Sequence, residues 1–376
     1  MLLKEILKNV ILLFLLCNIP GFLLVYFGET MGSISSYLTS AMLLVYFLIS
    51  KPWRKPAIPF LIFSITYFII SGLNNTIEDE ISFIKETIRF FIILFCVNEV
   101  LHDTKYKELF YILLLGGLSI IINGLIFPET NKIFGLIKGR YSGFFINPNT
   151  AGIVCLLGIA LSYKVKSDFW RITGQLILTI AGLLTLSRTF IIIWLLITVL
   201  SIKQNKKNII LPVLGSIGII LMLTFGDSKR FAGDRFDALT SFFDDGPVKT
   251  ETIQHDSRAE TWAQYYDLIM EKPFFGHGYK SFQVFSHLRH GAHNSYLMVF
   301  GEGGIISFII FISIYIYLLY WSLKSYKSEA TLLYICLVIL LNMSASHTYF
   351  FNYQSITLSI FLLIKIRAIK EKKNEN

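Results

Sequence analysis

Arg258 begins a stretch of sequence whose residue types could bind an anion. Ser257 and Glu260 form an S-x-x-E capping box, which predicts a helix that Pro273 ends. The expected apolar face of this helix holds Trp262, Tyr265, Tyr266, Ile269 and Met270. In the first turn, the charge of Arg258 opposes the helix dipole, a conflict that a bound anion would remove. Helix N-terminal amides and an arginine fork suit phosphate, whereas a salt bridge to Asp256 or Glu260 is the structural alternative.

A second arginine stands between two apolar stretches with almost no loop around it, in Ser187-Arg188-Thr189. Its place is near the outer end of two expected membrane helices. An arginine at this depth is costly unless it has a partner. We expect Arg188 either to reach the lipid headgroups with its long side chain or to face a polar cavity between helices.

Arg140 lies where the chain is expected to re-enter the membrane. Asn147 and Asn149 flank a proline shortly after it, a pattern that predicts a tight turn at the start of a helix. Asn149 is the candidate N-cap of that helix. Arg140 is therefore either an anion contact or an interfacial arginine in a structural turn.

Lys85 and Arg89 lie four residues apart, and this spacing puts them on one face of a helix. They add positive charge at the same expected membrane depth as the other arginines. Glu86, next to Lys85, is the residue that would neutralise one of them in the structural alternative.

His293 directly precedes a long apolar segment, so it is expected at the outer edge of the membrane. A neutral imidazole near pH 7 is well matched to proton abstraction. A lone histidine is also common in purely structural roles. His287 and His290 are nearby, so spacing alone does not single out His293.

The elements that must position these residues are apolar helices. Hydrophobic residues make up 54% of the 376 residues and charged residues 16%, against roughly 25% charged in soluble domains. Apolar windows of about the length that spans a bilayer fall near residues 8–27, 33–50, 57–73, 82–101, 108–126, 149–163, 172–187, 189–202, 208–225, 295–321, 329–346 and 352–368. The sequence predicts an all-α integral membrane protein with about 12 transmembrane helices.

Lysine and arginine residues gather in alternate breaks between these windows and at both ends, so both termini are predicted to be cytoplasmic. The net charge of +9 therefore reports membrane orientation and not nucleic-acid binding. The predicted division is nine spans over residues 1–225, one long external loop with short helices over 226–294, three spans over 295–368 and a cytoplasmic tail over 369–376. Chemistry is expected on the side of the long loop.

Several other classes of site are disfavoured. The four cysteines all fall inside apolar stretches, so neither a disulfide framework nor a metal site is indicated. The Gly276-His277-Gly278 segment lacks the preceding strand of a nucleotide-binding loop and is predicted to be a tight turn. No Walker motif or nucleotide-sugar motif is present, which argues against an ATP-driven pump and a cytoplasmic sugar-nucleotide transferase.

A set of motifs in this order resembles the bacterial O-antigen ligase and O-antigen polymerase family, which are polytopic glycan transferases. The motifs lie at residues 140–149, 187–189, 257–262, 273–278, 293–297 and 301–305. Each motif is weak alone, and their order and spacing make the set fairly specific. The resemblance covers roughly residues 140–310, whereas the first four expected spans add little beyond hydrophobicity.

This resemblance implies a GT-C-like fold in the bacterial inner membrane that acts at the periplasmic face on glycans linked to undecaprenyl pyrophosphate. It implies no metal and no nucleotide cofactor. Carried over residue by residue, Arg188 and Arg258 would bind the donor pyrophosphate, and His293 would be the base or positioning residue for the acceptor hydroxyl. Arg140 would be a further anion contact. Fixed arginines in a site of low dielectric would stabilise the charge that develops as the pyrophosphate leaves.

The leading hypothesis from the sequence is an O-antigen ligase-like glycosyltransferase that moves the lipid-linked glycan onto lipid A-core. A repeat-unit polymerase, with a growing glycan as acceptor, shares the same donor chemistry and is the nearest alternative. A protein O-oligosaccharyltransferase is a third member of this class. A polytopic transporter or flippase is the competing class. No motif identifies the acceptor, the sugars, the stereochemical outcome or the oligomeric state.

Overall fold

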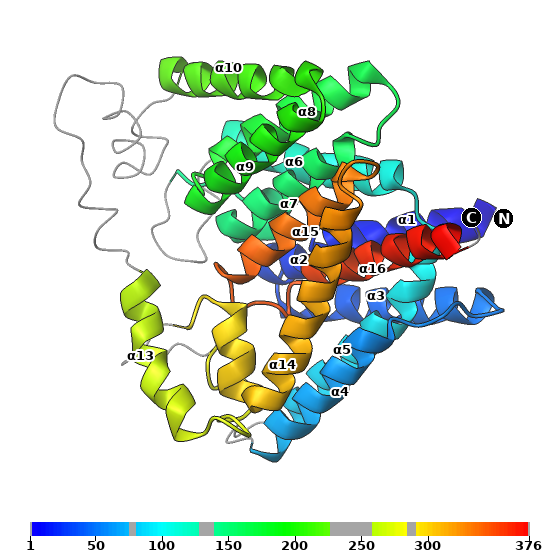
Figure 1. Cartoon of the computed structure of the whole chain (residues 1–376), viewed down its shortest axis with the longest axis vertical. Helices are drawn as coiled ribbons and strands as arrows, with labels where there is room; N and C mark the ends of the chain where they lie inside the picture. Colours follow the sequence, from blue (N-terminus) through cyan, green and yellow to red (C-terminus); the bar gives the residue numbers. More distant parts are fainter. Residues whose placement is uncertain (1, 75–79, 128–138, 226–257, 284–290, 375–376) are drawn as a thin grey trace. The chain divides into compact units, whose positions relative to one another are not determined.

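The computed structural model describes residues 2–74, 80–127, 139–225, 258–283 and 291–374, and it has helices but no strands in these ranges (Figure 1). The α-helices are α1 (Leu2–Leu16), α2 (Ile19–Phe27), α3 (Glu29–Ile49), α4 (Ile58–Leu73), α5 (Glu80–His102), α6 (Tyr106–Ile126), α7 (Pro148–Ser162), α8 (Asp168–Leu184), α9 (Arg188–Gln204), α10 (Ile210–Phe225), α13 (Arg258–Glu271), α14 (Ser295–Lys324), α15 (Ala330–Met343) and α16 (Tyr353–Asn374). Two short 3₁₀ turns are η1 (Gly143–Phe145) and η2 (Lys206–Ile209). The predicted all-α class is confirmed for the described ranges.

Each predicted apolar window coincides with a helix, except that the first window holds two. Among the described residues, α3, α6 and α14 are long and apolar enough to cross a membrane. The pair α1 and α2, bent by 60°, would make a fourth crossing. Shorter apolar helices are α4, α7 and α15. The chain is therefore a helical membrane protein, and the number of twelve crossings stays a prediction.

The bend between α1 and α2 has a local cause that a hydrophobicity window does not register. Asn18 adopts the left-handed conformation, with φ of 53°, which asparagine tolerates better than most residues. Pro20 follows in the first turn of α2 and has no backbone N–H to continue the ladder of α1. The apolar run thus continues through a break in the helix.

The chain divides into two compact units. The first comprises residues 1–39 and 104–256, and the second comprises residues 40–103 and 257–376. These two units are defined by which residues pack together, whereas the sequence predicted a division into membrane spans, an external loop and a tail. The two sets of boundaries therefore describe different things. Residues 226–257, most of the first half of the predicted external loop, lie outside the described residues.

In the first unit, α6, α7 and α8 pack closely through glycines. α7 is buried along almost its whole length. A Cβ at Gly158 would lie 2.7 Å from Cδ1 of Leu178, and a Cβ at Gly117 would lie 2.8 Å from Cδ2 of the same leucine. Small residues allow membrane helices to approach closely. These glycines thus give Leu178 of α8 its place between α6 and α7.

In the second unit, aromatic rings join α4 to α14 and to the segment before α16. The rings of Tyr67 and Phe350 stack with 4.2 Å between their centroids. The ring of Phe63, one turn earlier on α4, lies with its centroid 6.0 Å from that of Phe350 and 5.0 Å from that of Phe311 on α14.

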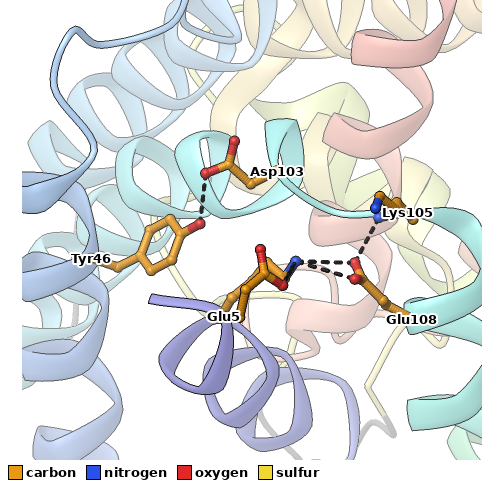
Figure 2. Close-up of polar contacts among 6 residues, drawn as sticks. Glu5, Tyr46, Asp103, Lys105 and Glu108 are labelled. Carbon is orange, nitrogen blue, oxygen red and sulfur yellow. Dashed lines mark hydrogen bonds and ion pairs between the residues drawn. The ribbon is translucent and has the colours of Figure 1, made fainter. Parts of the chain in front are cut away.

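A hydrogen bond joins two other helices of this unit. The hydroxyl of Tyr46 on α3 donates a 2.8 Å hydrogen bond to Asp103, which follows α5 (Figure 2). Long-range contacts of this kind join α4, the end of α5 and residues 40–49 of α3 to the rest of the second unit.

A buried lysine is held by two carboxylates in the first unit. Nζ of Lys8, whose side chain is 1% exposed, lies 2.7 Å from Glu5 and 3.2 Å from Glu108. Figure 2 shows that Glu108 also accepts a bond from the backbone N–H of Lys105, at 2.8 Å. Glu108 therefore both caps the start of α6 and ties it to α1.

Replacing Lys8 by methionine is expected to lower the free energy of unfolding by about 3 kcal/mol, because Glu108 would keep its charge in a partly buried place without its cation. Thermal denaturation of the purified chain in detergent measures this. Lys107→Met, at an exposed position of α6, is the matched control and should leave the midpoint almost unchanged. Equal midpoints for the two variants would contradict the assignment.

The helix predicted between Ser257 and Pro273 is confirmed: it is α13, which ends at Glu271, two residues before Pro273. Its predicted apolar face is only partly right. Tyr265 and Ile269 are buried, whereas Tyr266 and Met270 are 62% and 55% exposed. The buried stripe is narrower because α13 is covered mainly on the side that packs against α14. The predicted N-cap, Ser257, lies outside the described residues.

Candidate functional site

Two helix N-termini lie side by side in the first unit. Asn147 caps α7 by accepting a 2.8 Å bond from the N–H of Asn149, and Ser187 caps α9 by accepting from the N–H of Phe190. A Cβ at Gly152, in the first turns of α7, would lie 3.2 Å from Cβ of Phe190. The predicted cap of α7 was thus two residues off, because Pro148 occupies the first helical position and Asn147 the cap.

Arg140 braces these two helix starts. Its Nε donates a 2.9 Å bond to the carbonyl oxygen of Thr185, and its Nη2 donates a 2.9 Å bond to Oδ1 of Asn149. The residue is only 6% exposed. The neighbouring N–H of Tyr141 donates to the carbonyl of Leu184. This geometry favours the structural alternative for Arg140, since the guanidinium joins the turn after α8 to the first turn of α7.

Arg188 is the first residue of α9, and the turn between α8 and α9 is as short as the sequence predicted. The turn is held tightly: Leu186 has a φ of 47°, and the N–H of Ser187 donates to the hydroxyl of Thr185. The side chain of Arg188 is exposed. Its charge therefore lies at the positive end of a helix dipole, an arrangement that attracts anions.

The charged residues of α5 lie in the second unit. Lys85 is exposed, and Arg89 donates a hydrogen bond to the hydroxyl of Tyr353. Glu86 accepts 2.9 Å bonds from the hydroxyl of Tyr279 and from Nζ of Lys280. Glu86 is thus paired with a lysine that is distant in sequence, whereas the structural alternative had it neutralise either Lys85 or Arg89.

Arg258 is the first residue of α13, as predicted. Its side chain lies outside the described part of the chain, as do Asp256 and the side chain of Glu260. The choice between an anion and a salt bridge is therefore open at Arg258. The predicted turn at residues 276–278 is confirmed, with positive φ at both of its glycines.

A break in α14 receives this turn. Gly304 has a φ of 70°, and a Cβ there would lie only 2.0 Å from the carbonyl oxygen of Phe274. The N–H groups of His277 and Gly278 donate to the carbonyls of Gly301 and Glu302, which the break leaves without helical partners. The glycine at 304 thus lets the loop after α13 pack directly on the backbone of α14.

Glu302 is the buried anchor of this loop. The residue is 0% exposed, and its carboxylate accepts bonds from the hydroxyl of Tyr67, from the N–H of Phe282 at 2.9 Å and from Nε2 of Gln283 at 2.8 Å. Ionisable groups in membrane helices often mark transport pathways. Here the bonds of Glu302 join α4 and α14 to the loop, which indicates a structural role.

His293 follows this loop and is paired with a second histidine. Its N–H donates a 3.0 Å bond to Nδ1 of His347, and the two ring centroids are 4.7 Å apart. The side chain of His293 is exposed, whereas that of His347, in the loop that joins α15 to α16, is half-buried. Burial, followed by the charge of His293, lowers the pKa of His347 to about 4. His347 is therefore neutral at pH 7.

The low pKa of His347 predicts a pH dependence of stability. In the unfolded chain a histidine has a pKa of about 6.5, so between pH 6.5 and pH 4 the unfolded state binds more protons than the folded state. The free energy of unfolding should therefore fall as the pH falls through this range, by up to about 3 kcal/mol from this group. Thermal denaturation from pH 7 to pH 4.5 measures it. His347→Asn should flatten that part of the profile, and an unchanged slope would contradict the lowered pKa of His347.

The predicted site residues are distributed over both units. Arg140 and Arg188 belong to the first, and Lys85, Arg89, Arg258 and His293 to the second. Among the described residues, no group of three or more His, Cys, Asp and Glu residues could hold a metal ion.

The sequence did not predict the contact of His347 with His293 or the anchoring role of Glu302, although residues 301–305 were recognised as a motif. Glu302 carried a signal, an acidic residue within an apolar window. His347 carried almost none, since it stands in a short polar break and its contact with His293 spans 54 residues of sequence.

The fold and these residues define a class of protein. It is a helical membrane protein that has arginines at the starts of two helices and a pair of histidines, one of which precedes a third helix. The model of the O-antigen ligase family matches residues 174–312, so the predicted resemblance to that family is confirmed over this stretch. Members of this family are glycosyltransferase-like enzymes, and the family implies lipid-linked glycan substrates. The matched stretch includes Arg188, Arg258 and His293, but not Arg140, Lys85 or Arg89. No curated protein matches the chain.

Proposed function

We propose that the protein is a metal-independent glycosyltransferase that moves a glycan from undecaprenyl pyrophosphate onto an acceptor hydroxyl. The observation that carries this proposal is that the O-antigen ligase match contains the two arginines and the histidine expected from the motifs. The donor bond supplies the driving force, so neither a nucleotide nor a metal enters the reaction. Lipid A-core is the proposed acceptor, and a growing glycan is the alternative.

Arg188 is proposed to contact the donor pyrophosphate. Its position at the start of α9 supports this role, because the guanidinium and the helix dipole there attract the same anion. As the glycosidic bond breaks, negative charge grows on the leaving pyrophosphate. A fixed cation that becomes more strongly bound at that moment lowers the barrier. Arg258, also at a helix start, is proposed to do the same.

Arg140 is proposed to act indirectly. Its bonds to Thr185 and Asn149 keep the starts of α7 and α9 together, so it would hold Arg188 in place instead of binding phosphate itself. Lys85 and Arg89 are proposed to add positive charge around the donor. Of the two, Lys85 fits better, since Arg89 already donates to Tyr353.

His293 is proposed to accept the proton of the acceptor hydroxyl as the new glycosidic bond forms. Its exposed side chain before the start of α14 supports this role. A neutral imidazole is a suitable base near pH 7. The proposed setting is the inner membrane, with both termini cytoplasmic, the reaction at the periplasmic face and a GT-C-like arrangement of about twelve spans.

Glycan profiling of a deletion strain of the native host tests the proposal and identifies the acceptor. Silver-stained gels would compare the deletion strain with strains complemented by the wild type or by His293→Ala. Loss of all capped lipopolysaccharide with accumulation of lipid-linked polymer is expected for a ligase. Survival of core carrying a single repeat unit would assign a polymerase. An unchanged glycan profile in the deletion strain would contradict both.

A further inference from the structure

His293 has an unusual backbone conformation. Its φ of 45° lies in the left-handed region, although it is not glycine. A residue with a Cβ pays roughly 1–2 kcal/mol in this region. Such conformations persist only where the surroundings hold them, and they are frequent at functional sites. Groups around His293 must therefore hold its backbone in the left-handed conformation.

Three sets of hydrogen bonds fix the chain around His293. On one side, the N–H of Ala292 donates a 3.0 Å bond to the carbonyl of Phe282, whose own N–H is held by the buried carboxylate of Glu302. On the other side, the side chain of Asn294 caps α14 by accepting from the N–H groups of residues 296 and 297. Between them, the N–H of His293 itself donates to Nδ1 of His347.

The bond to His347 sets the state of its imidazole ring. Because Nδ1 accepts, the ring is neutral and carries its proton on Nε2. Gly291 leaves space for the far edge of the ring, since a Cβ there would lie 2.8 Å from Cε1 of His347 and 3.1 Å from Nε2. The next residue along, Thr348, bonds to Ser346 and keeps the short loop folded. These contacts fix the ring of His347 beside His293, and its Nδ1 bonds to the backbone N–H of His293.

We propose that His347 is a positioning residue for glycan transfer: the lone pair on its Nδ1 holds the peptide of His293 in the left-handed conformation and so aims the imidazole of His293 at the acceptor hydroxyl. This inference rests on the proposed function of His293 as the base. A displacement of about 1 Å in a catalytic group lowers turnover by as much as about 10²-fold. An acceptor atom at this position therefore has a large effect without touching substrate.

Two variants separate the lone pair from the bulk of the ring. His347→Asn keeps an acceptor oxygen close to the place of Nδ1, whereas His347→Leu keeps volume without any acceptor. Transfer would be measured with the purified full-length chain in nanodiscs, using undecaprenyl-pyrophosphate-linked glycan extracted from host membranes and lipid A-core. We expect the leucine variant to lose about 10- to 100-fold in kcat with KM for the donor changed less than about threefold, and the asparagine variant to regain most of kcat. Wild-type kcat in His347→Leu, or an equal loss in both variants, would overturn the proposal.

A double-mutant cycle tests whether His347 acts through His293. If it does, the variant carrying both His293→Ala and His347→Leu should be no slower than His293→Ala alone. Losses that multiply would overturn the proposal, since they would indicate an independent role. Thr348→Val, which removes a side-chain bond of the same loop but leaves the His347 contact, is the matched control and should keep at least about half of wild-type kcat. Thermal denaturation of each variant confirms that it is folded.

The cycle also distinguishes failure of this inference from failure of the proposed function. If His293→Ala is inactive and both His347 variants match the wild type, the base assignment stands and the inference is wrong. If His293→Ala itself retains wild-type transfer, the proposed role of His293 is wrong, and the inference is wrong with it.

Discussion

His293→Ala is expected to lower the turnover of glycan transfer by about 10²-fold or more. The alanine removes the group proposed to take the proton of the acceptor hydroxyl, while the backbone bond from residue 293 to His347 can still form. The donor contacts are expected to be unchanged, so KM for the lipid-linked glycan should stay within about threefold. Initial rates over a range of donor and acceptor concentrations measure both quantities. The loss should therefore appear in kcat.

The matched control for this prediction is His102→Ala. His102 is at the end of α5, a position that the sequence predicts on the cytoplasmic side, and its replacement should leave kcat within about twofold. A fall of less than about tenfold in His293→Ala would reduce His293 to a positioning residue. Wild-type turnover would exclude any role in the chemical step.

Arg188→Ala is expected to reduce kcat/KM for the donor by about 10²- to 10³-fold, the range found when one stabilising group of a transition state is removed. Arg188→Lys keeps the charge at the start of α9 but loses the two-pronged geometry that fits phosphate oxygens. We expect the lysine variant to recover less than about a tenth of wild-type activity. Steady-state transfer assays with a fixed acceptor concentration measure the effect.

Arg171→Ala is the matched arginine control in the same unit. Arg171 lies on α8 and forms a 2.7 Å salt bridge with the exposed Asp168, and such surface pairs contribute less than about 1 kcal/mol to stability. Its activity should stay close to that of the wild type. If Arg188→Lys were fully active, charge alone would suffice and the paired contact with phosphate would be wrong. If Arg188→Ala were fully active, the proposed donor contact itself would be wrong.

The helices were predictable because apolar length alone determines them. Every predicted window contains a helix, and the helix at Arg258 was located from its capping pattern and its proline. The break at Asn18 was not predicted, since hydrophobicity is continuous through it. The exposed side of α13 was misjudged because the pattern shows which residues are apolar but not how wide a surface covers them.

For the site, local sequence predicted where the arginines lie but not what they contact. The position of Arg188 at a helix start follows from the short break around it. The bond of Arg140 to Thr185, and the bond of Glu86 to Lys280, join residues that are distant in sequence. The contact of His347 with His293 could not be predicted for the same reason, because the two residues are 54 positions apart and meet only in the folded chain.

Transfer by the purified chain alone tests the proposed glycosyltransferase activity most directly. The protein in nanodiscs would receive undecaprenyl-pyrophosphate-linked glycan and lipid A-core, with a metal chelator and without any nucleotide. Glycan is expected to appear on lipid A-core while undecaprenyl pyrophosphate is released in equal amount, and His293→Ala and Arg188→Ala are each expected to lower both by about 10²-fold or more. No release of undecaprenyl pyrophosphate with any glycan acceptor would contradict the proposed transfer.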